Sequence, residues 1–109
     1  MATRVLLVDD HPIVRAGLRA VVEARGIAVV GEASTGEEAL AMASRIRPDV
    51  VLCDLRMGDG MDGVDTTAAL RRLPEPPAVL ILTTFDHDAQ IIRALEAGAA
   101  GYLLKDVDS

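Results

Sequence analysis

The sequence predicts an α/β domain built on a doubly wound, five-stranded parallel sheet. Five short segments rich in Val, Leu and Ile alternate with four segments of helical periodicity. Alternation of this kind favours parallel strands joined by helices that cover both faces of the sheet. The apolar segments do not alternate with polar residues, as expected for strands buried on both faces. Four of them end in polar or charged side chains, which one edge of a parallel sheet would bring together.

The strands are expected to be short, and the clearest of them begins after Pro48. Pro48 ends the helix before it, and an apolar, β-branched run then stops at Asp54. The segment that contains Gly31 and Glu32 is more polar, which indicates a strand at the edge of the sheet. The five predicted strands cover residues 4–8, 27–33, 50–54, 78–82 and 102–104.

Start and stop signals delimit four helices. Pro12 suits the first turn of a helix, where its missing N–H costs nothing. Thr35 offers an N-cap for the second helix, and acidic residues follow it in the first turn. The predicted helices run from Pro12 to Gly26, from the Ser34-Thr35 cap to Pro48, over residues 64–73, and from an Asp86 cap through Ala97.

The composition indicates a single domain with an aliphatic core. The 109 residues are enough for one core, and half are hydrophobic although there is one Tyr, one Phe and no Trp. The formal net charge of −6 argues against nucleic-acid binding by this stretch itself. Cys53 is the only cysteine, and its place in a central strand indicates a buried hydrophobe rather than a nucleophile. No signal peptide opens the chain and no apolar run could span a bilayer, so we expect a cytoplasmic protein without membrane contact.

Charged and hydroxyl side chains that follow four of the strands should share one rim of the sheet. They are Asp9-Asp10, Asp54, Thr83-Thr84 and Lys105. Three clustered carboxylates raise one another's pKa unless a cation joins them, and oxygen ligands open to water suit Mg²⁺ better than Zn²⁺. A cation, an amine and a hydroxyl around one aspartate would cradle a phosphoryl or other anionic group, with the carboxylate as nucleophile.

An ordered set of short motifs carries a resemblance over essentially the whole chain. The motifs are Leu6-Leu7-Val8-Asp9-Asp10, Val51-Leu52-Cys53-Asp54-Leu55-Arg56-Met57, Met61-Asp62-Gly63, Ile81-Leu82-Thr83, and Ala97-Gly98-Ala99-Ala100-Gly101-Tyr102-Leu103-Leu104-Lys105. Together they resemble the receiver domain of bacterial two-component response regulators. The Asp9-Asp10-His11-Pro12 opening and the Lys105-Asp106 ending are similar to the NarL/FixJ-like branch, whose output is usually a LuxR-type helix-turn-helix.

The resemblance implies a phosphorylation site and a metal site. Asp54 matches the phosphoacceptor, which takes a phosphoryl group from the phosphohistidine of a sensor histidine kinase. Asp9 and Asp10 match the acidic pair that binds Mg²⁺ together with Asp54. A further protein ligand in the family is the backbone carbonyl two residues after the acceptor, here that of Arg56.

The resemblance also implies a switch. Lys105 matches the lysine that pairs with the acceptor or its phosphoryl group, and Thr83 matches the hydroxyl that moves to bind the phosphoryl oxygen. Tyr102 matches the aromatic residue whose rotamer follows Thr83. The implied protein is a signalling switch, not an enzyme apart from its own phosphorylation and dephosphorylation. Residues 1–109 would form the receiver domain, with strand order 2-1-3-4-5, and DNA would be bound only through an output domain outside this chain.

One loop beside the rim departs from the family pattern, and several polar residues near the rim have a simpler role than catalysis or metal binding. The loop Met57-Gly58-Asp59-Gly60-Met61-Asp62-Gly63 lacks the usual Met-Pro and has one extra residue, so we expect it to be longer and looser. His11 and His87 could be metal ligands or phosphohistidines, but a role near a helix start is the simpler interpretation of each. Asp62 and Glu75 are interpreted as solvated loop acids. Thr84 is interpreted as a neighbour of Thr83 that affects access to the phosphorylation site.

The family's fifth helix, which follows the lysine, is not present before Ser109. We expect the first helix alone to cover one face of the sheet, leaving apolar side chains of the fourth and fifth strands in contact with water. The exposed face predicts homodimerisation, exchange of elements with a neighbour, or marginal stability. Dimerisation on phosphorylation is the other route that we consider.

Three alternatives stay open on the residues alone. A Mg²⁺-dependent aspartyl-phosphate phosphatase of the haloacid dehalogenase type would have a second Asp two places after the nucleophile, where this chain has Arg56. A flavodoxin-like cofactor binder would need a Ser/Thr/Gly-rich loop where this chain has Asp9-Asp10-His11. A receiver that no longer accepts phosphate is disfavoured by the complete set of matching residues.

Overall fold

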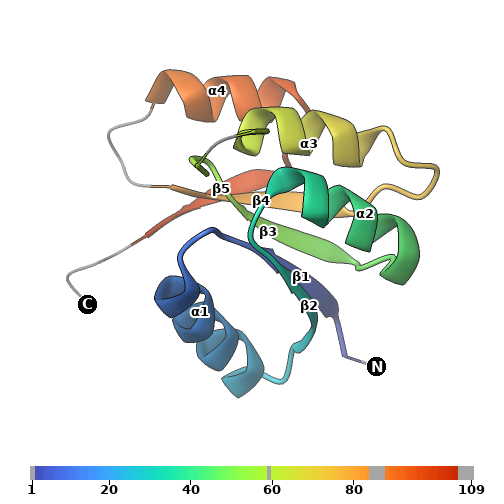
Figure 1. Ribbon diagram of the computed structural model, residues 1–109, viewed down its shortest axis with the longest axis vertical. Helices are drawn as coiled ribbons and strands as arrows, with labels where there is room; N and C mark the ends of the chain where they lie inside the picture. Colours follow the sequence, from blue (N-terminus) through green and yellow to red (C-terminus); the bar gives the residue numbers. More distant parts are fainter. Residues whose placement is uncertain (1, 59, 84–87, 106–109) are drawn as a thin grey trace.

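A computed structural model describes residues 2–58, 60–83 and 88–105, which form five parallel strands and four helices in three layers (Figure 1). The elements in chain order are β1 (Arg4–Val8), α1 (Pro12–Ala24), β2 (Ala28–Ala33), α2 (Gly36–Ile46), β3 (Val50–Asp54), α3 (Gly63–Arg71), β4 (Ala78–Thr83), α4 (Asp88–Glu96) and β5 (Gly101–Leu104). The fold class predicted from the sequence is therefore confirmed. Among the described residues, no helix is long and apolar enough to cross a membrane.

The strands lie in the order β2-β1-β3-β4-β5, with β2 at one edge as its polar sequence indicated. Every neighbouring pair is parallel, and the register aligns the carboxyl ends: Val8 pairs with Cys53, Asp54 with Leu82, and Thr83 with Leu104. The carboxyl ends of β1, β3, β4 and β5 therefore meet at a single edge of the sheet.

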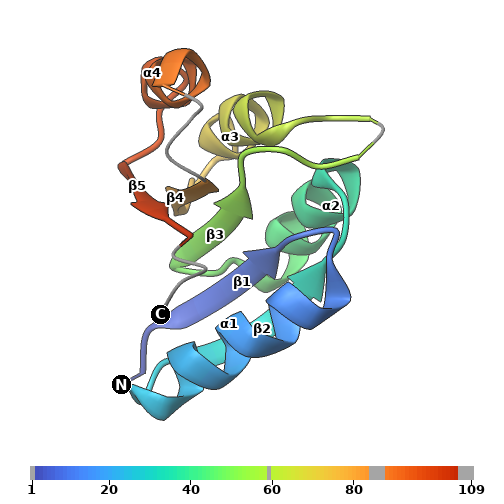
Figure 2. The same ribbon diagram turned by 90° about the vertical axis from the view of Figure 1, so that its left-hand side faces the viewer.

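The helices divide between the two faces of the sheet, with α1 on one face and α2, α3 and α4 on the other (Figures 1 and 2). Alternate residues of each central strand pack into two separate cores, one on each face of the sheet. Leu6, Cys53 and Ile81 lie in the larger core, which includes residues of α2 to α4. Leu7 and Leu82 lie in the smaller core with residues of α1. This explains why the strand sequences are apolar without alternation.

Local capping explains where the helices begin and end. Pro12 is the first residue of α1. The Thr35 side chain accepts a hydrogen bond from the Glu38 N–H at 3.0 Å, which caps α2. Arg47 then takes the left-handed conformation, with φ 48°, directly before Pro48 and ends the helix.

The third helix corrects one interpretation of the sequence. Asp62 is not a solvated loop acid, because its Oδ1 accepts a hydrogen bond from the Asp65 N–H at 2.8 Å and caps α3. The helix therefore begins one residue earlier than expected, at Gly63, and ends at Arg71 rather than at residue 73. The first and third strands have the predicted bounds, the other boundaries differ by one or two residues at most, and the expected cap at Asp86 lies outside the described residues.

The predicted exposure of apolar side chains holds for β5 and is wrong for Leu82 of β4. Tyr102, Leu103 and Leu104 are each about half exposed. Leu82 is buried in the core under α1, because that core reaches from β1 across β3 to β4.

Cys53 should be chemically inert in the folded protein. Burial, with smaller contributions from the negative charges of Asp54 and Asp9, raises the pKa of its thiol to about 12. Since the thiolate is the reactive species, a thiol reagent at mildly alkaline pH should leave the native chain unmodified and label it fully in denaturant. The unfolded thiol ionises near its ordinary pKa of about 8.5, so the contribution of Cys53 to stability should be lost as pH rises from there towards 12. Rapid labelling of the native chain would contradict the buried position.

Candidate functional site

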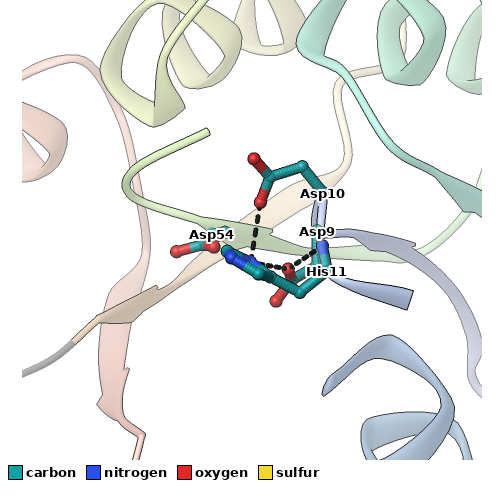
Figure 3. Close-up of side chains that lie close together, drawn as sticks. All are labelled: Asp9, Asp10, His11 and Asp54. Carbon is teal, nitrogen blue, oxygen red and sulfur yellow. Dashed lines mark hydrogen bonds and ion pairs between the residues drawn. The ribbon is translucent and has the colours of Figure 1, made fainter. Parts of the chain in front are cut away.

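Three carboxylates meet at the carboxyl edge of the sheet, as the sequence predicted. Asp9 and Asp10 follow β1, and Asp54 is the last residue of β3. Asp9 and Asp54 are buried, whereas Asp10 is partly exposed. Together with His11 they offer four ligand atoms that all lie within 4.8 Å of one another (Figure 3).

Lys105, the residue after β5, connects two of these carboxylates. Its Nζ lies 3.0 Å from Asp54 Oδ2 and 3.2 Å from Asp9 Oδ2. The side chain is only 21% exposed. Its backbone N–H donates to the carbonyl of Thr83 at 2.6 Å, which fixes the end of β5 against β4. The fifth strand thus delivers an ammonium to acids that come from β1 and β3.

Burial and charge act in opposite directions on this ion pair. Burial raises the pKa of Asp54, and the nearby charge of Asp9 adds to it, whereas the contact with Lys105 lowers it by less than the rise. Burial lowers the pKa of Lys105, but its contacts with Asp54 and Asp9 outweigh this and the pKa ends above its ordinary value. The ammonium is therefore held firmly charged, and it contacts two of the three carboxylates.

Asp10 is the carboxylate that Lys105 does not reach in a described contact. Its Oδ2 accepts a hydrogen bond from the Gly58 N–H at 2.9 Å. Its Oδ1 is buried and has no hydrogen-bond partner among the described residues, although His11 Nδ1 lies 2.8 Å away. A carboxylate oxygen that only the His11 imidazole approaches within the described part of the chain, beside two further carboxylates, fits a divalent cation. The acidic pocket could therefore hold a metal ion.

The loop after β3 is anchored at several points. The Arg56 N–H donates to Asp54 Oδ1 at 3.3 Å, and the Met61 N–H donates to Glu37 Oε2 at 3.3 Å. Gly63 is required because a Cβ there would lie 2.6 Å from the Asp54 carbonyl oxygen. Gly60 has a φ of 95°, which favours glycine. Both ends of the loop are thus attached beside the acids; residue 59 lies outside the described residues, and the greater looseness of the loop stays a prediction.

The remaining predicted site residues are distributed as follows. Thr83 is buried at the end of β4, on the same edge as the acids. The backbone of Arg56 adjoins Asp54 through the contact above, while its carbonyl as a metal ligand stays a prediction. Tyr102 lies on β5 in register with Ile81, and it is 47% exposed. Thr84 and His87 lie outside the described residues.

The sequence analysis missed one group of residues behind the site. Arg15 of α1 donates from Nη1 to the carbonyl oxygen of Asp9 at 2.7 Å and from Nε to Glu32 Oε1 at 2.9 Å. Arg19 also binds Glu32, and this hydrogen bond, with that of Arg15, holds the pKa of Glu32 below its usual range against the effect of burial. The only signal in the sequence was a glutamate within an otherwise apolar edge strand. This network attaches α1 to the backbone of the acidic pair.

The sequence also matches known proteins. The family model of the response regulator receiver domain matches residues 5–109. The chain belongs to this family. The transcriptional regulatory protein LiaR of Bacillus subtilis is 48% identical over 103 residues, covering 94% of this chain and 48% of LiaR. The nitrate/nitrite response regulator NarL of Escherichia coli K12 is 40% identical over 105 residues, covering 95% of this chain and 48% of NarL.

Solved structures agree with this assignment. The receiver domain of the response regulator NarL from Mycobacterium tuberculosis superposes with a TM-score of 0.90 at 43% identity, covering 96% of this chain and 85% of that one. The chemotaxis regulator CheY4 of Vibrio cholerae gives a TM-score of 0.86 at 31% identity, covering 96% of this chain and 88% of that one. The chain is thus a receiver domain of the NarL type, in a family of signalling proteins rather than classical enzymes. It spans about half the length of the curated relatives.

Proposed function

We propose that this receiver domain is a phosphorylation-dependent switch in which Asp54 accepts a phosphoryl group from a sensor histidine kinase. The observation that carries the proposal is the contact of Lys105 Nζ with Asp54 Oδ2 at 3.0 Å, beside the carboxylates of Asp9 and Asp10. An acceptor carboxylate, a fixed ammonium and an acidic pocket for a cation are the parts that phosphoryl transfer requires.

In the proposed reaction, side chains at the carboxyl edge of the sheet are already in place to surround the phosphoryl group. A carboxylate oxygen of Asp54 attacks phosphorus while the P–N bond of the kinase's phosphohistidine breaks and its electron pair returns to the imidazole. Lys105 and the Thr83 hydroxyl face the phosphoryl oxygens. Loss of the group is the attack of water on phosphorus, which breaks the P–O bond to Asp54 and releases inorganic phosphate. The aspartyl phosphate stays on the protein's own side chain, so the chain acts as a switch without turnover of an external substrate.

The donor set at the acidic pocket fits Mg²⁺. Asp9, Asp10, Asp54 and the backbone carbonyl of Arg56 would hold the ion, which would neutralise charge on the transferring oxygens. Hard oxygen donors that keep part of their contact with water are the ligands that Mg²⁺ prefers. The partial exposure of Asp10, whose Oδ1 makes no hydrogen bond within the described residues, supports an open site of this kind.

The proposed readout runs from Thr83 to Tyr102. A hydrogen bond from Thr83 to the phosphoryl group would draw β4 towards Asp54, and Tyr102 would turn inward from its half-exposed position. The change would alter the surface made by α4 and β5. We infer that this surface controls a DNA-binding, transcription-regulating output outside this chain, since LiaR is named as a transcriptional regulatory protein. A cytoplasmic location follows from such an output.

Phosphorylation should be confined to Asp54 and should require a divalent cation. Incubation with acetyl phosphate and Mg²⁺ should add one phosphoryl group to the wild-type chain, as measured by intact mass. Asp54→Asn and chelator should each abolish the addition, because the first removes the nucleophile and the second leaves the carboxylates repelling the donor. Asp65→Asn, which changes an exposed acid of α3, is the matched control and should be phosphorylated like wild type. Equal labelling of Asp54→Asn would refute the assignment.

A phosphate mimic should change the environment of Tyr102. Tyr102 is the only tyrosine, so its ring resonances can be followed without ambiguity. They should shift and broaden on saturation with beryllofluoride and Mg²⁺, because the ring exchanges a solvated position for a packed one. In Thr83→Ala the shift should be largely lost. A ring environment that is identical with and without saturating mimic would rule out this relay.

We also propose that two copies of the chain associate. The outer strand β5 carries three half-exposed apolar side chains, Leu103 on one face of the sheet and Tyr102 and Leu104 on the other, and exposed apolar side chains favour contacts between proteins. Light scattering on the same samples reports dimerisation. A chain that stays monomeric with and without the mimic would remove this part and leave phosphorylation unaffected.

A further inference from the structure

The imidazole of His11 lies among the carboxylates of the acidic pocket (Figure 3). Its Nδ1 is 2.8 Å from Asp10 Oδ1 and 3.3 Å from Asp9 Oδ1. Its backbone N–H also donates to Asp9 Oδ1, at 2.8 Å. The side chain is 66% exposed, so neither burial nor core packing accounts for its orientation.

The capping role that the sequence favoured does not explain this position. His11 is the N-cap residue of α1, but its side chain makes no capping hydrogen bond. A side chain that served the helix end would turn towards the free N–H groups of the first turn. The Nδ1 atom instead faces the two acids that precede the helix.

The geometry suits a shared ion. One atom from each of Asp9, Asp10, His11 and Asp54 lies within 4.8 Å of the others. Ligands that bind one first-row transition ion at about 2.0 to 2.2 Å are separated by up to about 4.4 Å, so small side-chain movements would close the set around one ion. The exposed His11 and the partly exposed Asp10 have room for such movements.

The nature of the ligands then determines which ion is preferred. Carboxylate, carbonyl and water ligands suit Mg²⁺, whereas a neutral imidazole nitrogen suits Co²⁺, Ni²⁺ and Zn²⁺ and adds little for Mg²⁺. An imidazole added to the carboxylates therefore shifts the selectivity of the pocket towards these ions.

We propose that His11 is a metal ligand through Nδ1 and that it raises the affinity of the acidic pocket for first-row transition dications relative to Mg²⁺. The inference deepens the proposed function, since it rests on the same cation site, and it assigns to this chain a ligand beyond the carboxylates and the carbonyl. It means that the metal which supports phosphorylation is selected in part by the side chain that directly precedes the first helix.

Binding of Co²⁺ and Mg²⁺ to the 109-residue chain tests this, measured by calorimetry at a pH where free imidazole is neutral. The ratio of Co²⁺ to Mg²⁺ affinity should fall about tenfold or more in His11→Gln, since even the loss of a group that supports a ligand costs about 10- to 100-fold. His87→Gln removes the chain's other imidazole and is the matched control, for which the ratio should stay at the wild-type value.

Paramagnetic NMR gives the direct readout of coordination. Co²⁺ should produce strongly shifted imidazole resonances, including an exchangeable Nε2–H, and these should be absent in His11→Gln and present in His87→Gln. An unchanged affinity ratio, or no shifted imidazole signal in a chain that binds Co²⁺, would show that His11 only neutralises the acids and would overturn the inference. Binding of both ions that survives in Asp54→Asn and Asp10→Asn would instead refute the proposed cation site itself.

Discussion

The ammonium of Lys105 between the carboxylates of Asp9 and Asp54 is the interaction on which the site depends. It joins the residue after β5 to acids delivered by β1 and β3, so it exists only when the outer strand is in place across β4. The register of the sheet fixes this geometry, because Asp54 is paired with Leu82 and the Lys105 N–H is bonded to the Thr83 carbonyl. The ion pair therefore depends on the order and register of β1, β3, β4 and β5.

This arrangement has an electrostatic cost that the core must offset. Two unit charges separated by about 4.8 Å interact with about 3 to 4 kcal/mol at an effective dielectric constant of 20, before solvent screening. That is a large part of a typical domain stability of about 5 to 15 kcal/mol. Lys105 compensates two of the acids, the imidazole of His11 lies against Asp9 and Asp10, and the raised pKa of Asp54 shows that burial is not fully offset. The two apolar cores supply the stability that makes such a cluster tolerable.

Features that depend on chain order could be predicted from the sequence. The apolar run that ends at Asp54 identified the central strand, and parallel topology alone placed Asp9, Asp10 and Lys105 beside it. These predictions succeed because strand ends on one edge converge whatever the details of side-chain packing.

Features that depend on side-chain direction could not be predicted in this way. The orientation of His11, the cap formed by Asp62, and the attachment of α1 through Arg15 and Glu32 each require the position of a rotamer in the folded chain. The burial of Leu82 was missed for a related reason, since it depends on how far the core under α1 extends across the sheet. Local pattern identifies which residues approach an edge, and packing decides what each of them contacts there.

In the proposed function, the acidic pocket is unfavourable by itself and is stabilised by a cation. The most direct measurement is the free energy of unfolding in urea for the wild type and Asp10→Asn, each with chelator and with Mg²⁺. The substitution removes a charge and keeps an acceptor for the Gly58 N–H, so Asp10→Asn should be more stable than wild type in chelator. Mg²⁺ should then stabilise the wild type by about 2.7 kcal/mol at a hundred times its dissociation constant and the variant by much less. A variant that is less stable than wild type in chelator, with an equal response to Mg²⁺, would show that the pocket is not relieved by a cation.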